Sequence, residues 1–443
     1  MVRLASIAFV LLDACGMVRA DDFPVDQVVP KVMTLASPDQ QYALYLPPGY
    51  SRNRQWSVLI MLDPRGRAEA TLARVQEGAR RNGWIVMSSY QSRSDTLEIV
   101  TLFALQGLLD ESDKRFSTDR HRLYLAGMSG TAKTLWKVVK PLKGSLAGMI
   151  GCAGGYSSEL PPLTESVPAF YGCTGRHDFN HREMKDLEAS LDKLGSPHYL
   201  LEFDGGHGWP EAGLDHAIDW LQLSAIKTGL APPHKSWIAG QFSAARQAAL
   251  SAPDEFRRGR ALQRVAADFR GVHDLGDTSE LSARMLASPE ARASAARETQ
   301  LCDDERKYAG LVNDWFTRMR ARLPDGRPQD PPPKPQSLAA LKVRSLQKLA
   351  AGSDREFSDS ANRRLELAFA ASNSYLPAEA MQRKEPGIAA ASRPVAAAIF
   401  PDRAIPPDQF RQATLGRTVA LVASRRQGRH PCAVAADRWP RCA

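Results

Sequence analysis

The sequence predicts an α/β protein, with a mostly parallel β-sheet flanked by helices and an all-helical region after it. Between residues 41 and about 225, short apolar runs alternate with stretches of helical periodicity. This alternation is typical of a parallel sheet whose two faces are both buried by helices. After about residue 230 the strand-like runs stop and only helical patterns remain. The length of 443 residues leaves room for two domains or more.

The predicted strands are apolar runs that end at turn-forming residues. The first ends at Pro47 and Pro48, and the second is broken by the sequence Asp63-Pro64-Arg65-Gly66. Helical patterns follow the second and third runs, up to residue 80 and over 96–109. The expected strands cover residues 42–46, 56–62, 84–88, 122–126, 147–152, 168–173 and 199–203.

The region after residue 230 is predicted to form a helical domain over 231–375. Leu262, Val265, Ala266 and Phe269 recur at the spacing of one helical stripe. A proline-rich segment at 323–336 indicates a linker inside this domain. The tail, 376–443, is rich in Ala, Arg and Pro, has weak periodicity and predicts no defined elements. The expected helices cover residues 236–250, 281–319, 337–351 and 360–371.

The first twenty residues have the pattern of an export signal. Arg3 precedes the apolar run 4–12, and Val18-Arg19-Ala20 fits the small-residue pattern before a cleavage site. The mature domain then begins at residue 21 and extends to 230, and the protein is expected to be periplasmic or secreted. A second interpretation is a lipoprotein signal ending at Cys15, and membrane attachment is expected only in that case.

Cysteine spacing and charge exclude several classes of site. None of the six cysteines has CxxC spacing, so no zinc site is expected. Cys152 and Cys173 end two predicted strands, and we expect buried thiols there rather than a disulfide. Cys432 and Cys442 flank a short loop that would permit pairing in an oxidising compartment. The net charge of +9 comes from scattered arginines without a nucleic-acid motif, so no nucleic-acid partner is expected. No metal and no cofactor are expected either.

The residues 123–132 combine a strand, a turn of small residues and the start of a helix. Ser129 stands in this turn between Gly127 and Gly130. In a nucleophile elbow, the serine occupies a strained turn of this kind, and small neighbours allow strand and helix to approach closely. The pattern is G-x-S-x-G with Thr131 in place of the last glycine. Taken alone, a phosphate-binding or purely structural turn fits as well.

An acidic residue and a histidine follow Ser129 in the chain order Ser, Asp, His, which is the order of a catalytic triad in this fold class. Asp178 comes just after the predicted strand 168–173, and His207 lies in a glycine-rich turn after the strand 199–203. The chemistry needs all three residues, because a serine hydroxyl is a weak nucleophile until a histidine takes its proton and an acid orients the imidazole. The joint occurrence, each at a strand end, favours a catalytic triad over three unrelated turns.

Other residues compete for these roles. Asp204 is the alternative acid, although it lies too near His207 in the same loop. His177 and His181 are alternative bases, but their position beside the acid favours a surface or substrate-facing role. His216 lies in a predicted helix and is expected to be solvated.

The oxyanion hole needs two backbone N–H donors. Gly130, directly after the serine, offers one of them, and the loop 63–66 should supply the other. Because Pro64 has no N–H, Arg65 or Gly66 must donate, and we favour Arg65.

At these residues the chain resembles bacterial α/β-hydrolases of the esterase D, feruloyl esterase and polyhydroxybutyrate depolymerase type. The matching segments lie within residues 30–228 and are 45–50, 62–66, 126–130 and 204–210. The resemblance implies an α/β-hydrolase fold, with Ser129, Asp178 and His207 as the triad. The sequence departs from the family pattern at two positions that bear on catalytic efficiency. Asp63-Pro64 replaces the usual His-Gly pair of the oxyanion loop, and Thr131 replaces a glycine of the elbow. The helical region resembles degenerate tetratricopeptide-like helix pairs, although no clean repeat of that length is present.

The predicted function is hydrolysis of a small or polymer-borne carboxylic ester through an acyl-serine intermediate. One alternative is a serine peptidase with the same triad. Another is a weak or inactive hydrolase-like domain that binds its ligand while the C-terminal helices recruit a protein partner.

Overall fold

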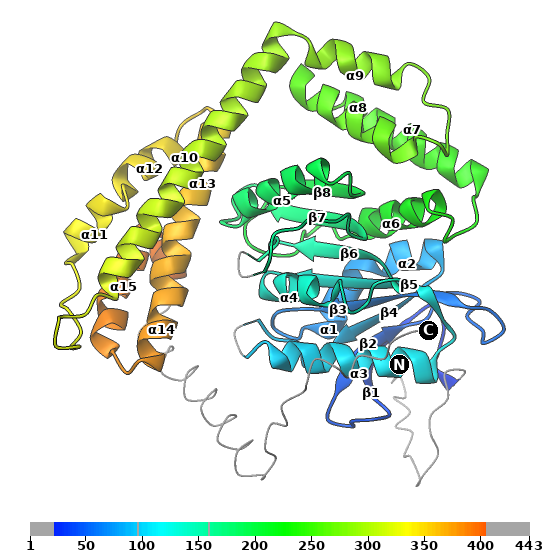
Figure 1. Cartoon of the computed structure of the whole chain (residues 1–443), viewed down its shortest axis with the longest axis horizontal. Coiled ribbons are helices and arrows are strands. Elements are labelled where there is room, and N and C mark those ends of the chain that lie inside the picture. The colour runs from blue at the N-terminus through cyan, green and yellow to red at the C-terminus, as the bar shows by residue number, and fades with distance from the viewer. Residues whose placement is uncertain (1–21, 95–96, 158–159, 405–443) are drawn as a thin grey trace, which may run out of the picture.

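The computed structural model describes residues 22–94, 97–157 and 160–404. The expected export signal, Cys15, Cys432 and Cys442 lie outside these residues. In the described part, an eight-stranded sheet forms the first half of the chain, and a long helical arm follows it (Figure 1). Among the described residues, no helix has the length and apolarity needed to cross a membrane.

The sheet has the strand order β1-β2-β4-β3-β5-β6-β7-β8. β2 is antiparallel to both of its neighbours, and the strands from β4 to β8 are parallel to one another. The strands are β1 Val28–Met33, β2 Gln41–Tyr45, β3 Trp56–Leu62, β4 Trp84–Ser89, β5 Thr118–Met128, β6 Leu146–Cys152, β7 Ala169–Gly175 and β8 His198–Phe203. This is the predicted α/β-hydrolase architecture, and every predicted strand is present within a few residues of its expected bounds.

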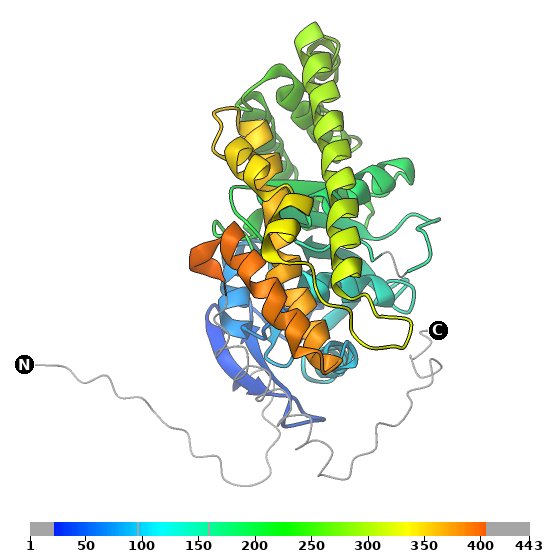
Figure 2. The ribbon, with the colours of Figure 1, turned by 90° about the vertical axis from the view of Figure 1, so that its left-hand side faces the viewer.

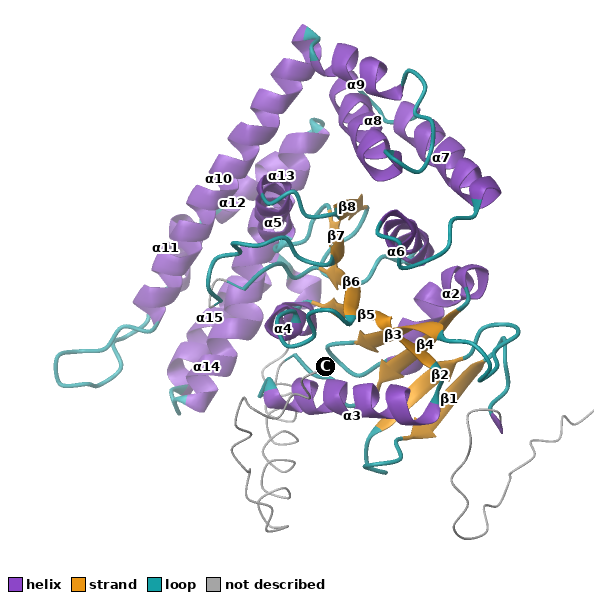
Figure 3. Ribbon diagram, turned by 45° about the vertical axis from the view of Figure 1, so that its right-hand side comes forward, coloured by secondary structure: helices purple, strands orange, loops and turns teal. Residues whose placement is uncertain are grey.

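Helices cover both faces of the sheet, as Figure 3 shows. α1, α2 and α6 bury one apolar core against one face, and α3, α4 and α5 bury a second core against the other. These helices are α1 Ala68–Leu72, α2 Gln76–Asn82, α3 Ile99–Arg115, α4 Gly130–Val138, α5 His181–Lys193 and α6 Asp215–Lys227. The double coverage explains why the inner strands are apolar along their whole length.

After α6 the helical arm crosses the β8 edge of the sheet with α7 to α9, and α10 to α15 then descend beside the ends of the strands on the side of α4 and α5 (Figures 1 and 2). α7 and α8 share an apolar core with α6, whereas α10 to α15 form a separate core of their own. The arm consists of α7 Lys235–Leu250, α8 Glu255–Phe269, α9 Thr278–Leu286, α10 Pro289–Met319, α11 Lys334–Ala340, α12 Val343–Ala350, α13 Arg355–Ala370, α14 Leu376–Gln382 and α15 Pro386–Ile399.

Several elements differ from the expectations. The pattern over 281–319 is divided into α9 and α10 by Ser288, whose side chain accepts the Ala291 N–H at 3.1 Å and caps α10, with Pro289 in the first turn. β1 was missed because Pro30 and Lys31 interrupt its apolar pattern. α14 and α15 occupy residues for which no element was expected, because small alanine side chains pack closely there without giving a strong periodic signal.

The expectation of free thiols at Cys152 and Cys173 is wrong, because the structure joins them in a disulfide. The two cysteines are direct partners in the register of the neighbouring parallel strands β6 and β7, with Cα atoms 4.6 Å apart. That separation is within the range that a disulfide spans. The residue spacing in the sequence did not reveal this register.

Candidate active site

Ser129 stands at the sharp turn between β5 and α4. Its backbone has φ 56° and ψ −125°, a left-handed conformation that costs a non-glycine residue about 1–3 kcal/mol. The Ser129 N–H donates to the carbonyl of Cys152 at 2.8 Å, which fixes the turn to the end of β6. A strained serine between a strand and a helix is the geometry of a nucleophile elbow.

Glycines make the close approaches around Ser129 sterically possible. A Cβ atom on Gly127 would lie 2.7 Å from the backbone nitrogen of Ala132 in α4. A Cβ atom on Gly154 would lie 2.4 Å from the carbonyl oxygen of Ser129 itself. Both contacts involve backbone atoms that have little freedom to move, so these two positions exclude any side chain.

Thr131, which departs from the family pattern, fits the elbow without displacing it. Its side chain is fully buried, and its hydroxyl lies 2.5 Å from the carbonyl of Leu62 at the end of β3. The same hydroxyl accepts the N–H of Met128 at 3.0 Å. Thr131 therefore ties the elbow to the neighbouring strand, a contact that glycine could not make.

The structure brings Ser129, His207 and Asp178 together in one hydrogen-bonded chain. His207 Nε2 lies 2.8 Å from Ser129 Oγ, and His207 Nδ1 lies 2.9 Å from Asp178 Oδ1. Asp178 is fully buried, whereas His207 is partly exposed. These are the contacts by which an imidazole can take a proton from a serine while a carboxylate holds the opposite ring nitrogen.

The acid is held by its own loop. Asp178 Oδ1 also accepts the N–H of Asn180 at 2.8 Å, and the Asn180 side chain donates to the carbonyl of Ala153 at 2.8 Å. These contacts connect the acid loop after β7 to the loop after β6, which carries the residues beside the elbow.

The competing residues lie away from the triad contacts. The Asp204 side chain is 77% exposed and pairs with Arg176, not with His207. His177 Nε2 contacts Asp359 of α13 at 2.8 Å, and His181 Nε2 lies 3.5 Å from Glu202. His216 is an exposed residue of α6, as expected.

The oxyanion hole differs from the prediction in one of its two donors. Gly130 is the first residue of α4, so its N–H has no partner within the helix and lies next to Ser129. The expectation for Arg65 is contradicted, because its N–H donates to the Asp63 carboxylate at 2.8 Å. The Gly66 N–H is engaged as well, at 3.0 Å from the Asp63 carbonyl. The loop thus uses these two N–H groups to hold itself together.

Asp63 has a role that the sequence did not reveal. Its buried carboxylate accepts the Trp209 indole N–H at 2.9 Å and pairs with Arg67 at 2.9 Å. Burial alone would raise the pKa of Asp63, but the hydrogen bonds from Arg67, Trp209 and the backbone lower it below its usual value. Because Trp209 is two residues after His207, this carboxylate links the loop after β3 to the base loop.

An aromatic stack beside the base was also missed. The ring of Phe179 stacks on the His207 imidazole with centroids 4.2 Å apart, and Tyr375 meets Phe179 edge-on at 6.4 Å. Phe179 follows the predicted acid directly, but Tyr375 comes from the helical arm, and only the folded chain brings it here.

Within the described part of the chain, no group of three or more His, Cys, Asp or Glu side chains is placed to hold a metal ion. The residues that meet at Ser129 supply a nucleophile, a base and an orienting acid. Chemically, this set can support transfer of an acyl group to Ser129 and then to water.

No family model matches the sequence, and no curated protein matches it. Esterase 2 of Thermogutta terrifontis is similar in structure, with 11% identity, coverage of 44% of this chain and 92% of the esterase, and a TM-score of 0.36. The S-formylglutathione hydrolase of Staphylococcus aureus has 13% identity, 46% and 99% coverage and a TM-score of 0.36. The fluorophosphonate-binding serine hydrolase F of the same organism has 14% identity, 43% and 98% coverage and a TM-score of 0.35.

Proposed function

We propose that the protein is a serine hydrolase that cleaves a carboxylic ester through an acyl-Ser129 intermediate. The proposal depends above all on one observation, the continuous chain of contacts from Ser129 Oγ through His207 to the buried carboxylate of Asp178. The strained turn at Ser129 adds support, because it presents the hydroxyl at the end of a parallel strand.

The proposed reaction has two steps. His207 Nε2 takes the Ser129 proton as Oγ attacks the ester carbonyl, and the Gly130 N–H stabilises the oxyanion. The imidazolium then gives its proton to the departing alcohol, which leaves an acyl group on Ser129. In the second step His207 takes a proton from water as the water oxygen attacks the acyl carbonyl. The imidazolium then returns this proton to Ser129 Oγ as the bond to the acyl group breaks, which releases the carboxylic acid and regenerates the Ser129 hydroxyl.

A fluorophosphonate probe and a panel of p-nitrophenyl esters of increasing acyl length test this function. We expect the probe to label the wild type and the panel to be hydrolysed, with both signals lost in Ser129→Ala. Ser190→Ala, an exposed serine on α5, is the matched control and should retain both. Ester turnover that survives in Ser129→Ala would overturn the proposal.

One observation favours a second candidate, a hydrolase-like domain that binds ester ligands with little turnover. The Arg65 N–H, expected to complete the oxyanion hole, is occupied by Asp63. Labelling of Ser129 without turnover of any ester in the panel would support this candidate. Preferential cleavage of peptide amides in the same assay would instead support a serine peptidase.

We also infer that the protein works outside the cytoplasm. The Cys152–Cys173 disulfide supports this location, because disulfides persist mainly in oxidising compartments. Fractionation of the expressing cell tests the location, and full retention in the cytoplasm would contradict it. Labelling with a lipid precursor, compared between wild type and Cys15→Ser, distinguishes a lipoprotein from a soluble exported protein.

A further inference from the structure

The acid and base loops lie at an open edge of the sheet. Asp178 follows β7 and His207 follows β8, and β8 is the last strand of the sheet. The two loops support each other through backbone bonds of 2.9 Å, from Arg176 to Phe203 and from His177 to Gly205. In the described part of the chain, no further strand supports the base loop from the outer side. Three of its residues, Gly205, Gly206 and Gly208, add conformational freedom.

α13 of the helical arm occupies that outer side. Arg355, Asp359 and Arg363 recur every four residues and therefore share one face of the helix. Arg355 donates to Asp204 of the base loop at 2.7 Å. Asp359 contacts His177 of the acid loop at 2.8 Å, and Arg363 donates to the carbonyl of Arg176 at 2.7 Å. One stripe of α13 thus contacts residues that precede Asp178 in the acid loop and a residue that precedes His207 in the base loop.

α13 is anchored firmly enough to act as a support. Arg363 and its partner Glu305 of α10 are both largely buried, and Arg363 donates to one Glu305 oxygen from two nitrogens, at 2.6 and 3.0 Å. On the other side, the core of α10 to α15 buries Leu365 and Ala368 of α13. The helix is therefore fixed to the arm independently of the two loops.

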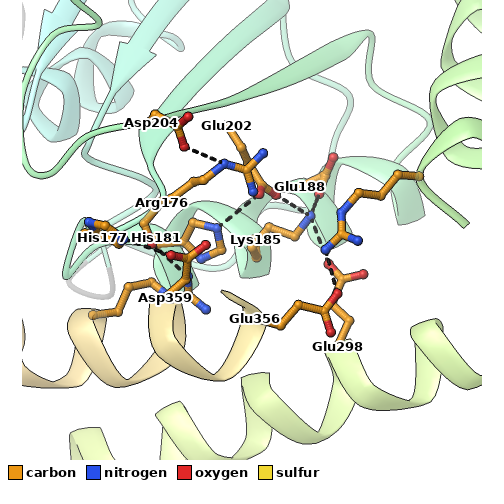
Figure 4. Close-up of polar contacts among 12 residues, drawn as sticks. Arg176, His177, His181, Lys185, Glu188, Glu202, Asp204, Glu298, Glu356 and Asp359 are labelled. Carbon is orange, nitrogen blue, oxygen red and sulfur yellow. Dashed lines mark hydrogen bonds and ion pairs between the residues drawn. The ribbon is translucent and has the colours of Figure 1, made fainter. Parts of the chain in front are cut away.

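The contacts of α13 are not a by-product of an extended apolar interface. A cavity of about 590 Å³ lies between α5 and β8 on one side and α8, α10 and α13 on the other. Its walls are charged, and Figure 4 shows Lys185 among Glu188, Glu202 and Glu298, with Asp359 directed at His177. Polar contacts, several of them on the two loops, thus connect the arm to this edge of the sheet.

The segment after α13 also reaches the base. A π-helical turn, Ala371–Tyr375, places the Tyr375 ring against Phe179, and Phe179 stacks on His207. Such turns within α-helices are frequent at functional sites. The arm therefore supports the catalytic imidazole through Phe179 as well as through the two loops.

We propose that α13 is a positioning element of the catalytic site, in which Asp359 and Arg363 hold the acid loop and Arg355 holds the base loop so that Asp178 and His207 stay in contact. This inference depends on the proposed hydrolase function for its kinetic readout, but hydrogen exchange tests the loop support itself whether or not the protein turns over an ester.

The main variant is Asp359→Ala in the full-length protein. Its kcat for p-nitrophenyl acetate should fall about 10-fold to 100-fold, because a displacement of the order of 1 Å between catalytic groups costs about that much. The KM should change by no more than about twofold, since this small substrate would be bound as before. Asp359→Asn retains an oxygen acceptor for His177 and should recover most of the lost kcat.

Glu366→Ala is the matched control. Glu366 is on the same helix, is 14% exposed against 13% for Asp359, and pairs with Arg403 of the arm instead of with the loops. Both variants remove one carboxylate from α13, so a general loss of stability would affect both. Only Asp359→Ala should lower kcat and accelerate exchange of the backbone amides in residues 176–180 and 204–208.

A surface variant covers the case in which Asp359→Ala does not fold. Arg355 and Asp204 are both exposed, so Arg355→Ala should fold normally and accelerate exchange mainly in residues 204–208. The inference is overturned if exchange in both loops is unchanged in the folded variants, or if Asp359→Ala and Glu366→Ala have the same kcat. A wild type that hydrolyses no ester would count against the proposed function alone, since the exchange rates still decide whether α13 holds the loops.

Discussion

The nucleophile and the acid–base pair are held in place by different parts of the molecule. Ser129 is fixed from within the sheet, by its bond to Cys152, by the close approaches at Gly127 and Gly154 and by the Thr131 hydroxyl. These are contacts between neighbouring strands or within one turn. The elbow therefore depends on residues of the α/β domain alone.

Asp178 and His207 instead lie in loops at the edge of the sheet, and neighbouring residues of these loops receive contacts from α13, 151 to 187 residues further along the chain. The difference teaches that one component of the site is fixed by the α/β domain alone, whereas the other has contacts of that domain and also contacts from the helical arm. If the two sides are held separately, substitutions at the elbow and at the two loops should disturb different properties of the enzyme.

The largest expected effect is at the acid. Asp178→Asn should lower kcat about 10⁴-fold, because an amide in this position favours the wrong imidazole tautomer and no longer stabilises the imidazolium. The buried side chain keeps its size, so the fold should persist. Steady-state kinetics on p-nitrophenyl acetate measure the loss, and circular dichroism checks the fold.

Asp204→Asn is the control for this prediction. Asp204 is exposed and pairs with Arg176 and Arg355, so its loss should weaken the support of the base loop and lower kcat less than about 10-fold. Equal losses in the two variants would show that the acid has been assigned to the wrong residue.

A smaller effect is expected on the side of the elbow. Gly154→Ala places a methyl group against the Ser129 carbonyl, and we expect kcat to fall about 100-fold as the serine shifts relative to His207. Amide exchange in the loops at 176–180 and 204–208 should stay as in the wild type, in contrast to Asp359→Ala. The matched control is Gly310→Ala in α10, where an added Cβ meets nothing within 4 Å and should leave kcat unchanged. Faster exchange in both loops of Gly154→Ala would contradict the separation of the two sides.

The same distinction between local and long-range contacts governs what the sequence could predict. The parallel strands were predictable because each is a continuous apolar run between turn residues. Ser129, Asp178 and His207 were predictable because each follows such a strand and parallel strands end at one edge of the sheet. Small residues also surround Ser129 and His207, whereas Asp178 depended on its place after a strand alone. The order of the three residues then supplied the roles.

The remaining features depend on contacts that sequence spacing does not encode. The Cys152–Cys173 disulfide depends on the register of β6 against β7. The prediction for Arg65 failed because its N–H donates to the carboxylate of Asp63, two residues earlier. The contact between Tyr375 and Phe179 requires the arm to turn back along the sheet. In each case the missing information was which segments meet.

Asp63 connects the two sides of the site and gives the smallest expected effect. Asp63→Asn removes the charge that holds Arg67 and Trp209, and we expect a loss of about 2 kcal/mol in the free energy of unfolding at pH 7. Asp277→Asn, in an exposed pair with Arg246, should cost less than about 0.5 kcal/mol. Urea denaturation of the three proteins measures both values.

The loss of stability in Asp63→Asn should depend on pH. Hydrogen bonding lowers the pKa of Asp63 in the folded state. The Asp63 carboxylate therefore stabilises the fold fully above the pKa that Asp63 has in the unfolded chain, about 4. This stabilisation is lost as the pH falls through the lower pKa of the folded state. The difference in unfolding free energy between wild type and Asp63→Asn should therefore be constant from pH 5 to 7 and shrink below about pH 4. A difference that grows as the pH falls would mean that Asp63 carries no stabilising charge. In that case the Trp209 contact, and with it the link between the loop after β3 and the base loop, would have to be maintained by packing alone.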